Sequence, residues 1–177
     1  MTSKKLNLGC GKDIRSDYIN LDCVALPGVD IVGDISQVPL PFEDNTFDEI
    51  LCQSILEHVD YIAVLQEIYR ILKPGGSVKI IVPHFTSKYA YTDPTHCHFF
   101  SIQTLLFFVA DHPNDYYFSF HFSKAGKTHI AFNRKIAYFY NYLLEPIVNQ
   151  NIRTQDFYEG SIFRIFPATD IEVVLIK

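Results

Sequence analysis

The 177-residue chain lacks an excess of positive charge, a long apolar run and a metal-type cysteine pattern. Fifteen Lys and Arg against twenty Asp and Glu give a net charge of −5, so we expect no nucleic-acid partner, since non-specific binding needs a basic face. No apolar run approaches the roughly 20 residues of a membrane-spanning helix, and no apolar signal segment opens the chain. The four cysteines show no C-x-x-C spacing. We expect a cytoplasmic protein without a membrane span.

No Gly- or Ser-rich linker and no repeat divides the chain, which predicts one domain over residues 1–177. Its halves nevertheless differ in composition. Residues 1–84 carry 7 basic and 12 acidic side chains, whereas residues 85–177 carry 8 of each. Of the 26 Phe and Tyr residues, 21 follow residue 84, as do most of the His residues. We therefore expect an acidic scaffold over 1–84, an aromatic, His-bearing region over 85–169 and a closing strand over 170–177.

The hydrophobic pattern predicts an α/β fold. Strand signals occur at 4–8, 18–22, 29–34, 47–52 and 77–82, and a helix is predicted over 54–72, opened by a Ser54 and Glu57 capping box. This alternation predicts a mostly parallel sheet with helices on both faces. Beyond residue 84 we expect helices over 101–111 and 135–148 and strands over 116–122 and 170–176, the two strands forming an antiparallel hairpin at the sheet edge.

Candidate ligand-binding residues follow the predicted strands, because ligands of open parallel sheets bind at the carboxyl ends of the strands. Glycines let backbone approach a ligand closely. A carboxylate after the second strand can accept hydrogen bonds from ribose hydroxyls, and one after the third can accept from an adenine amine. These properties describe an adenosine site. Its candidates are Gly9, Cys10, Gly11, Asp22, Asp34, Ile35, Gln53 and Ser54.

At residues 6–11, 22, 33–35, 47–50, 56–58 and 72–76 the sequence resembles, in order and spacing, the Rossmann-like (class I) S-adenosylmethionine-dependent methyltransferases. The resemblance covers residues 4 to about 84 and the terminal strand. It implies S-adenosylmethionine as the cofactor, residues 1–84 as the cofactor-binding half and residues 85–169 as a cover and substrate region.

The sequence departs from that family at three places. Asn7 stands where many members carry an acid, and Asp13 replaces the third glycine. Asp22 follows Gly9 by only thirteen residues, too few for a full helix between the first two strands. Some bacterial members share this feature, which indicates a short bacterial-type member with an abbreviated first crossover. A dinucleotide dehydrogenase fits less well, because Ile14 stands where its third glycine belongs and Asp13 would repel a diphosphate.

The segment 84–98 follows the fifth strand, where a methyl acceptor would reach the sulfonium. We predict His84, Asp93 and His96 as catalytic candidates, since imidazole titrates near neutral pH and residues 93–96 resemble a motif of some family members. The alternative is a structural turn built on Asp93. His84, Asp93, His96 and His98, with Cys97 as a further candidate, could also ligate Zn²⁺, but adjacent ligand types rarely all face one ion, and we expect no metal site. Glu57 and His58 are interpreted as structural, because Glu57 completes the capping box.

The sequence therefore predicts methyl transfer from S-adenosylmethionine to a small-molecule or metabolite acceptor. The alternative is a non-catalytic S-adenosylmethionine-binding or interaction protein on the same fold. A metal-dependent enzyme is a third, weaker interpretation. We expect residues 85–130 to cover the carboxyl edge of the sheet. The Tyr and Phe residues at 99–122 and 138–142 predict core beneath this cover or an oligomer face, through which a homodimer could form.

Overall fold

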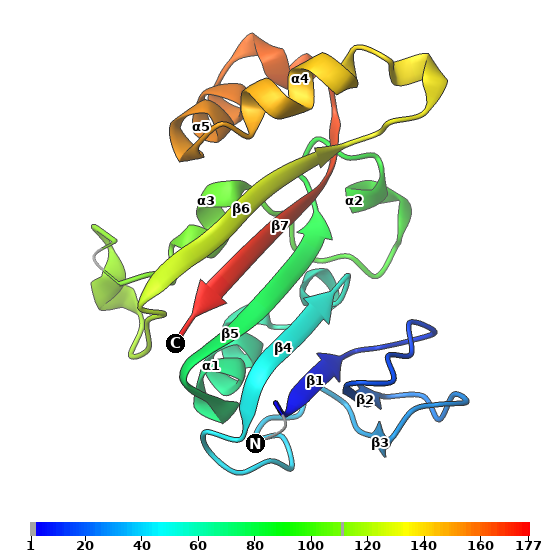
Figure 1. The fold of residues 1–177 in the computed structure, drawn as a ribbon, viewed down its shortest axis with the longest axis vertical. Coiled ribbons are helices and arrows are strands. Elements are labelled where there is room, and N and C mark those ends of the chain that lie inside the picture. The colour runs from blue at the N-terminus through cyan, green and yellow to red at the C-terminus, as the bar shows by residue number, and fades with distance from the viewer. Residues whose placement is uncertain (1–2, 111) are drawn as a thin grey trace.

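A seven-stranded sheet in the order β3-β2-β1-β4-β5-β7-β6 runs through the computed structural model, which describes residues 3–110 and 112–177 (Figure 1). Its parallel strands are β1 (Lys5–Leu8), β2 (Ile19–Asp22), β3 (Ile31–Val32), β4 (Phe47–Gln53) and β5 (Leu72–Pro83). β7 (Ala168–Ile176) pairs antiparallel with both β5 and β6 (Lys124–Phe132). The predicted mostly parallel sheet with a late antiparallel hairpin is confirmed.

The main core lies between this sheet and helix α1 (Tyr61–Ile71). Strand residues alternate between the two faces of a sheet, so one set of side chains in β1, β4 and β5 faces the helix. These strand side chains and the inward face of α1 are completely or almost completely buried against each other. The strands contribute Leu6, Leu8, Ile50, Cys52, Val78 and Ile80, and the helix contributes Val64, Leu65, Ile68 and Ile71. This packing fixes the carboxyl ends of β1, β4 and β5 relative to one another.

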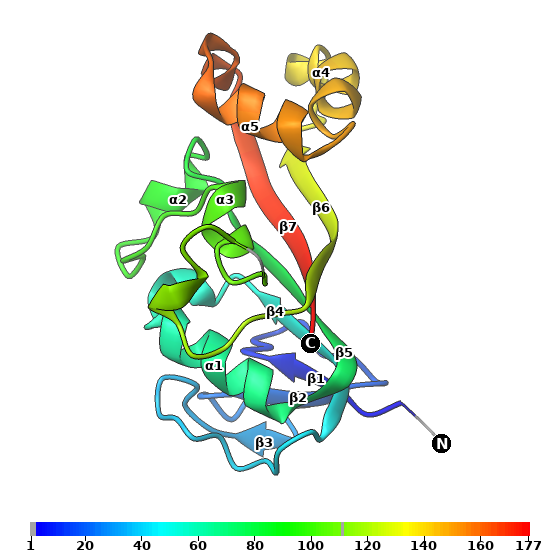
Figure 2. The same ribbon diagram turned by 90° about the vertical axis from the view of Figure 1, so that its left-hand side faces the viewer.

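Helices lie on one side of strands β1 to β5, and α4 (Asn141–Val148) also reaches the other face at β6, where Glu145 Oε1 lies 3.0 Å from His129 Nε2. Figure 2 shows α1, α2 (Tyr89–Thr92) and α3 (Ile102–Leu106) on the same side of the sheet. The physical reason is that the connections from β1 to β2, β2 to β3 and β3 to β4 contain no helix among the residues described, so nothing is available to cover the other face of these strands. That face carries ion pairs between Lys5 and Glu49 and between Lys79 and Glu172.

Two buried asparagines replace the missing helix of the first crossover. The Asn7 side-chain amide donates to the carbonyl of Asp13 and to the Asn20 side chain. Asn20 in turn accepts from the amide of Arg15 and donates to the carbonyls of Arg15 and Tyr18. Side-chain amides therefore satisfy loop backbone groups that a helix would satisfy internally. The expectation that this connection is too short for a full helix is confirmed.

Helix α1 begins later than predicted, and the capping box is wrong. The N-cap is Asp60, whose carboxylate accepts from the amides of Ile62 and Ala63. Ser54 has a positive φ of 52° and precedes a separate 3₁₀ turn, Leu56–His58, so it cannot open the helix. Glu57 therefore takes no part in capping α1, and its side chain has to be considered with the site instead.

The second half agrees less closely with prediction. Residues 116–122 do not form a strand of the sheet; the outer hairpin strand is β6 instead. The predicted helix over 101–111 is shortened to α3 among the residues up to 110, and residue 111 lies outside the described residues. The helix predicted over 135–148 is shortened to the 3₁₀ turn Ile136–Tyr138 and α4 (Asn141–Val148). α5 (Ile152–Gly160), absent from the sequence-based prediction, and the 3₁₀ turn Ile162–Ile165 follow; a further 3₁₀ turn spans Asp115–Tyr117.

The aromatic residues of the second half divide into two groups. Phe100, Phe108 and Phe122 are buried against Tyr61 and Tyr69 of α1, as expected for core beneath a cover. By contrast, the aromatic side chains at 138, 139 and 142 are exposed on and before α4. A homodimer through this second group stays a prediction. Within the described ranges, no helix has both the length and the apolar character needed to cross a bilayer.

Candidate functional site

Two neighbouring pockets lie at the carboxyl ends of the parallel strands, and Ser54 lines both of them. Ser54 follows β4, next to the loop that follows β1, and strand order reverses between these two strands. This is the position at which open α/β sheets bind ligands. The positive φ of Ser54 is uncommon for a residue with a side chain, and such conformations occur often at functional sites.

The first pocket, of about 260 Å³, surrounds the loop after β1. Both glycines of the loop have positive φ, but they differ in what surrounds them. A Cβ on Gly9 would lie 2.7 Å from Ile55 Cγ1, so packing requires this glycine, whereas a Cβ on Gly11 would meet no atom within 4 Å. Gly11 therefore presents open backbone to the pocket. The lining residues are Asn7, Gly9, Cys10, Gly11, Lys12, Asp13, Gln53 and Ser54.

Asp22 lies at the end of β2, beneath this loop. Its Oδ2 accepts from the amide of Gly11 at 2.7 Å, and its Oδ1 accepts from the amide of Val24 at 2.9 Å. A carboxylate oxygen can accept more than one hydrogen bond, so each oxygen keeps capacity for a ligand hydroxyl. Asp22 thus holds the glycine loop in place and remains a candidate for binding ribose.

Asp34 and Ile35 follow β3 and do not line this pocket. The exposed carboxylate of Asp34 accepts from the amide and hydroxyl of Ser36 and from the Gln37 side chain, and these bonds lower its pKa. The Ile35 side chain is buried in the main core. Only the backbone of Ile35 is therefore available for a ligand contact, and Asp34 is already engaged in its own turn.

The second pocket, of about 650 Å³, opens between the end of β4 and the segment after β5. Three of its lining residues are acidic, namely Glu57, Asp93 and Asp170, and two are histidines, His58 and His96. Burial raises the pKa of Asp170, which sequence analysis did not single out. The remaining lining residues are Ser54, Pro83, Tyr89, Thr92 and Pro94.

Glu57 is the most unusual residue of this pocket. Its side chain is 1% exposed, and neither carboxylate oxygen has a hydrogen-bond partner. Burial raises its pKa to about 7, although its own backbone amide and His96 act in the opposite direction; the negative charges of Asp170 and Asp93 make smaller contributions that raise it further. A buried carboxylate without partners is costly, and it is not the capping residue that the sequence predicts.

Of the predicted catalytic residues, Asp93 and His96 lie together at this pocket and His84 does not. The backbone amides of Cys97 and His98 donate to the Glu57 carbonyl, which brings His96 beside Glu57. Asp93 Oδ1 accepts from the amide and hydroxyl of Thr95, and these bonds lower the pKa of Asp93. The expected turn at Asp93 is therefore present, and it also presents His96 to the pocket.

His84 is completely buried and ties three elements together. Its Nδ1 accepts from the Thr86 amide, so Nε2 carries the proton and donates to Glu159 Oε1 at 3.0 Å. The same Glu159 oxygen accepts from the Ile102 amide at the start of α3. With both ring nitrogens engaged and no place in the pocket lining, His84 is not positioned to touch an acceptor.

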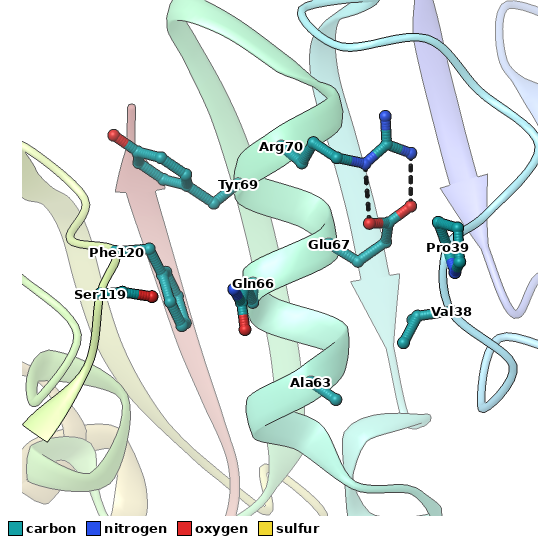
Figure 3. A pocket seen from close by; sticks show the side chains of 9 residues that line it. All are labelled: Val38, Pro39, Ala63, Gln66, Glu67, Tyr69, Arg70, Ser119 and Phe120. Carbon is teal, nitrogen blue, oxygen red and sulfur yellow. Dashed lines mark hydrogen bonds and ion pairs between the residues drawn. The ribbon is translucent and has the colours of Figure 1, made fainter.

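A separate hollow of about 490 Å³ lies on the outer side of α1, bordered by residues 38–39 and 119–120 (Figure 3). Its charged groups are engaged with each other and with backbone. Figure 3 shows Arg70 bridging both carboxylate oxygens of Glu67, and Arg70 also bonds Asp44 and the carbonyls of Leu40 and Phe42. These contacts anchor the 40–44 loop to α1, which is a structural role.

Comparisons with known proteins relate part of this chain to methyltransferases. Residues 11–80 match the family model described as "Methyltransferase domain". A stretch of 90 residues is 56% identical to an uncharacterized protein of Methanocaldococcus jannaschii, covering 44% of this chain and 39% of that protein. A stretch of 75 residues is 36% identical to a ubiquinone/menaquinone biosynthesis C-methyltransferase of Haemophilus ducreyi, covering 39% of this chain and 29% of that protein. The matches thus span less than half of these relatives' length.

The fold is shared more widely than the sequence. A crystal structure of an S-adenosylmethionine-dependent methyltransferase from Archaeoglobus fulgidus superposes with a TM-score of 0.66 at 17% identity, covering 99% of this chain and 86% of that one. The chain therefore has the class I methyltransferase fold, and S-adenosylmethionine is the cofactor that this fold and the domain match imply.

Proposed function

We propose that this chain, which has the fold of the class I S-adenosylmethionine-dependent methyltransferases and their domain sequence over residues 11–80, transfers a methyl group to a small-molecule acceptor. The observation that carries the proposal is the sharing of Ser54 by two pockets. One pocket contains the glycine loop, and the other contains the acidic residues and histidines. A cofactor in the first and an acceptor in the second would meet at Ser54.

The residues around the first pocket fit the cofactor. When bound, S-adenosylmethionine supplies a methyl group activated on a cationic sulfonium. Gly11 offers backbone with open space beside it, and Asp22 retains acceptor capacity for ribose hydroxyls. Cys10, Gln53 and Ser54 complete the wall. Asp34 and the backbone of Ile35 are proposed, less directly, for the adenine end, since they follow the neighbouring strand. The excess of acidic over basic side chains in residues 1–84 suits the cationic sulfonium of this cofactor.

The second pocket can bind, orient and deprotonate an acceptor. His96 Nδ1 lies 3.1 Å from the Ala90 carbonyl, which can only accept, so Nδ1 carries the proton and Nε2 keeps its lone pair. That lone pair can take a proton from an acceptor hydroxyl or amine. Asp93 acts through Thr95 and the turn that positions His96, and is thus a positioning residue. Because methyl transfer from a sulfonium needs mainly alignment and exclusion of water, these contributions are sufficient.

Incubation with methyl-labelled S-adenosylmethionine and the ultrafiltered small-molecule fraction of a cell extract tests the proposal. We expect label in a low-molecular-mass product with the wild-type chain. Asp93→Asn should reduce the rate while leaving S-adenosylhomocysteine binding unchanged, because Asp93 lies outside the cofactor pocket. Binding of S-adenosylhomocysteine without labelled product from any fraction would favour the non-catalytic alternative. Label found only in macromolecules would contradict the small-molecule acceptor.

A further inference from the structure

Glu57, His58 and His96 converge at one point of the second pocket. One potential metal-ligating atom from each residue lies within 4.8 Å of those of the other two. The two imidazole rings are 4.6 Å apart and nearly perpendicular, at 75°. His96 Nε2 lies 3.9 Å from Glu57 Oε1, too far for a hydrogen bond. Two histidines and one carboxylate form a donor set that suits divalent first-row transition ions.

Hydrogen bonding fixes the histidine tautomers in the form that a metal ion requires. His96 donates from Nδ1 to the Ala90 carbonyl, as described above. His58 Nδ1 lies 2.8 Å from Thr95 Oγ1, and the Thr95 hydroxyl hydrogen is already donated to Asp93 Oδ1 at 2.6 Å. Thr95 therefore accepts from His58 Nδ1. Both histidines consequently keep the Nε2 lone pair, and metal-bound histidines almost always donate their other ring N–H in this way.

Glu57 supplies an independent reason to expect a cation. Its two buried oxygens have no hydrogen-bond partner, although buried polar groups in proteins almost always have one. Asp93 and Asp170 line the same pocket, so the surrounding charge is negative once these groups are ionised. A divalent ion would satisfy the Glu57 carboxylate and offset this charge.

We propose that Glu57, His58 and His96 bind one divalent transition-metal ion, with its remaining coordination positions open to the second pocket. Ligand atoms on one ion lie about 3–3.5 Å apart, so the three side chains draw together when the ion binds. The inference departs from the expectation of no metal site because Glu57, and not His84, His98 or Cys97, completes the set with the two histidines. His98 instead packs its ring on Tyr61.

The role of the ion rests on the proposed function, whereas its binding does not. An acceptor hydroxyl that coordinates a divalent ion loses its proton more readily, because the ion stabilises the resulting oxyanion. The ion would then replace His96 as the group that activates the acceptor, beside the Ser54 boundary with the cofactor pocket. Phenols and other oxygen acids are the acceptor class that this arrangement favours.

Calorimetric titration of Zn²⁺, and of Co²⁺ with its visible absorption, into the untagged, chelator-treated full chain tests the site. We expect one ion per chain. Glu57→Gln and His96→Gln should each weaken binding at least 100-fold, and Thr95→Val, which removes the His58 partner, by about 10- to 100-fold. His98→Gln is the matched control, a neighbouring histidine outside the cluster, and should leave binding unchanged.

Several outcomes would overturn the proposal. These are no saturable binding by the wild-type chain, equal binding by wild type and Glu57→Gln, or loss of binding in His98→Gln alone. Thr95→Val changes an exposed turn and keeps the test valid if a buried variant does not fold. Titration of S-adenosylhomocysteine into the same variants separates the two proposals. If the cluster variants lose metal binding but still bind S-adenosylhomocysteine, the metal site is separate from the cofactor site. If the wild-type chain binds metal but transfers no methyl group, only the proposed function is contradicted.

Discussion

The carboxylate of Glu57 lies 3.9 Å from Nε2 of His96 and makes no hydrogen bond, although its side chain is 99% buried. Both Glu57 oxygens are buried, and neither has a partner in hydrogen-bond geometry. Burying such a carboxylate destabilises the folded state, because its desolvation is not offset by hydrogen bonds. The relationship between these two residues therefore points to a ligand or reactant in the pocket that they share.

The burial of Glu57 predicts a pH-dependent difference between the wild-type chain and Glu57→Gln in the presence of a chelator. The pKa of Glu57 is raised from 4.5 to about 7, so the folded state prefers the protonated form. The favourable contribution of that form is fully present below pH 4.5 and is lost as the pH rises to about 7. The difference between these two pKa values corresponds to about 3 kcal/mol of folding free energy.

Chemical denaturation at several pH values measures this difference. The free energy of unfolding of Glu57→Gln relative to wild type should rise by up to about 3 kcal/mol between pH 4.5 and pH 8, because glutamine cannot ionise. A difference that stays constant across this range would show that Glu57 is hydrated or paired in solution.

Helix capping gives a second prediction. Asp60→Ala should destabilise the chain by about 1 kcal/mol, because it removes the acceptor for two amides at the start of α1. Ser54→Gly should be neutral or stabilising, since glycine adopts the positive φ of this position without strain. Thermal denaturation of these two variants and of Ser54→Ala shows which residue caps the helix. Destabilisation by Ser54→Ala and none by Asp60→Ala would restore the capping box expected from the sequence.

The two errors around α1 have one cause. The residues from Ser54 to Glu57 fit the spacing of a capping box, and no local signal in the sequence reveals the positive φ of Ser54. That conformation results from the turn out of β4 at the site, where Ser54 lines both pockets. Local sequence rules therefore fail at a candidate site residue, as expected where backbone conformation is set by tertiary structure.

The elements formed by local patterns were predictable, and those formed by distant contacts were not. The apolar alternation of β1, β2, β4 and β7 identified these strands and placed Gly11, Asp22 and Ser54 at their carboxyl ends. Residues 124–132 contain Gly126 and several polar residues, and become β6 through pairing with β7. The Tyr and Phe alternation at 116–122 resembles a strand, but Phe120 and Phe122 pack against Tyr69 of α1 instead.

Asn7 provides a third prediction, because its side chain bonds the loop of the short first crossover. Asn7→Asp should destabilise the chain by roughly 1–3 kcal/mol at neutral pH, because a carboxylate cannot donate to the Asp13 carbonyl or to Asn20. Denaturation by urea measures the loss. Asn7→Asp with wild-type stability would show that the side-chain network does not hold the short crossover.

The two loop glycines form a matched pair for a fourth prediction. Gly9→Ala should destabilise the fold, since its Cβ would meet Ile55 at 2.7 Å at a positive φ. A Cβ at Gly11 would meet no atom within 4 Å, but Gly11→Val would place a β-branched residue at a φ of 49°, so this variant should lose stability through backbone strain alone. Gly11→Val should also bind S-adenosylhomocysteine at least tenfold more weakly, as its side chain occupies the pocket. Normal binding by Gly11→Val would show that the loop is only a turn.

The most direct test of the cofactor site is the calorimetric titration of S-adenosylhomocysteine into the wild-type chain and Asp22→Ala. We expect saturable binding to one site by the wild type. Asp22→Ala should bind at least tenfold more weakly, since hydrogen bonds to a charged group contribute about 1.5–3 kcal/mol each and the ribose hydroxyls would lose their acceptor. Circular dichroism would establish that the variant is folded. Absence of binding by the wild type, or wild-type affinity in folded Asp22→Ala, would contradict the account.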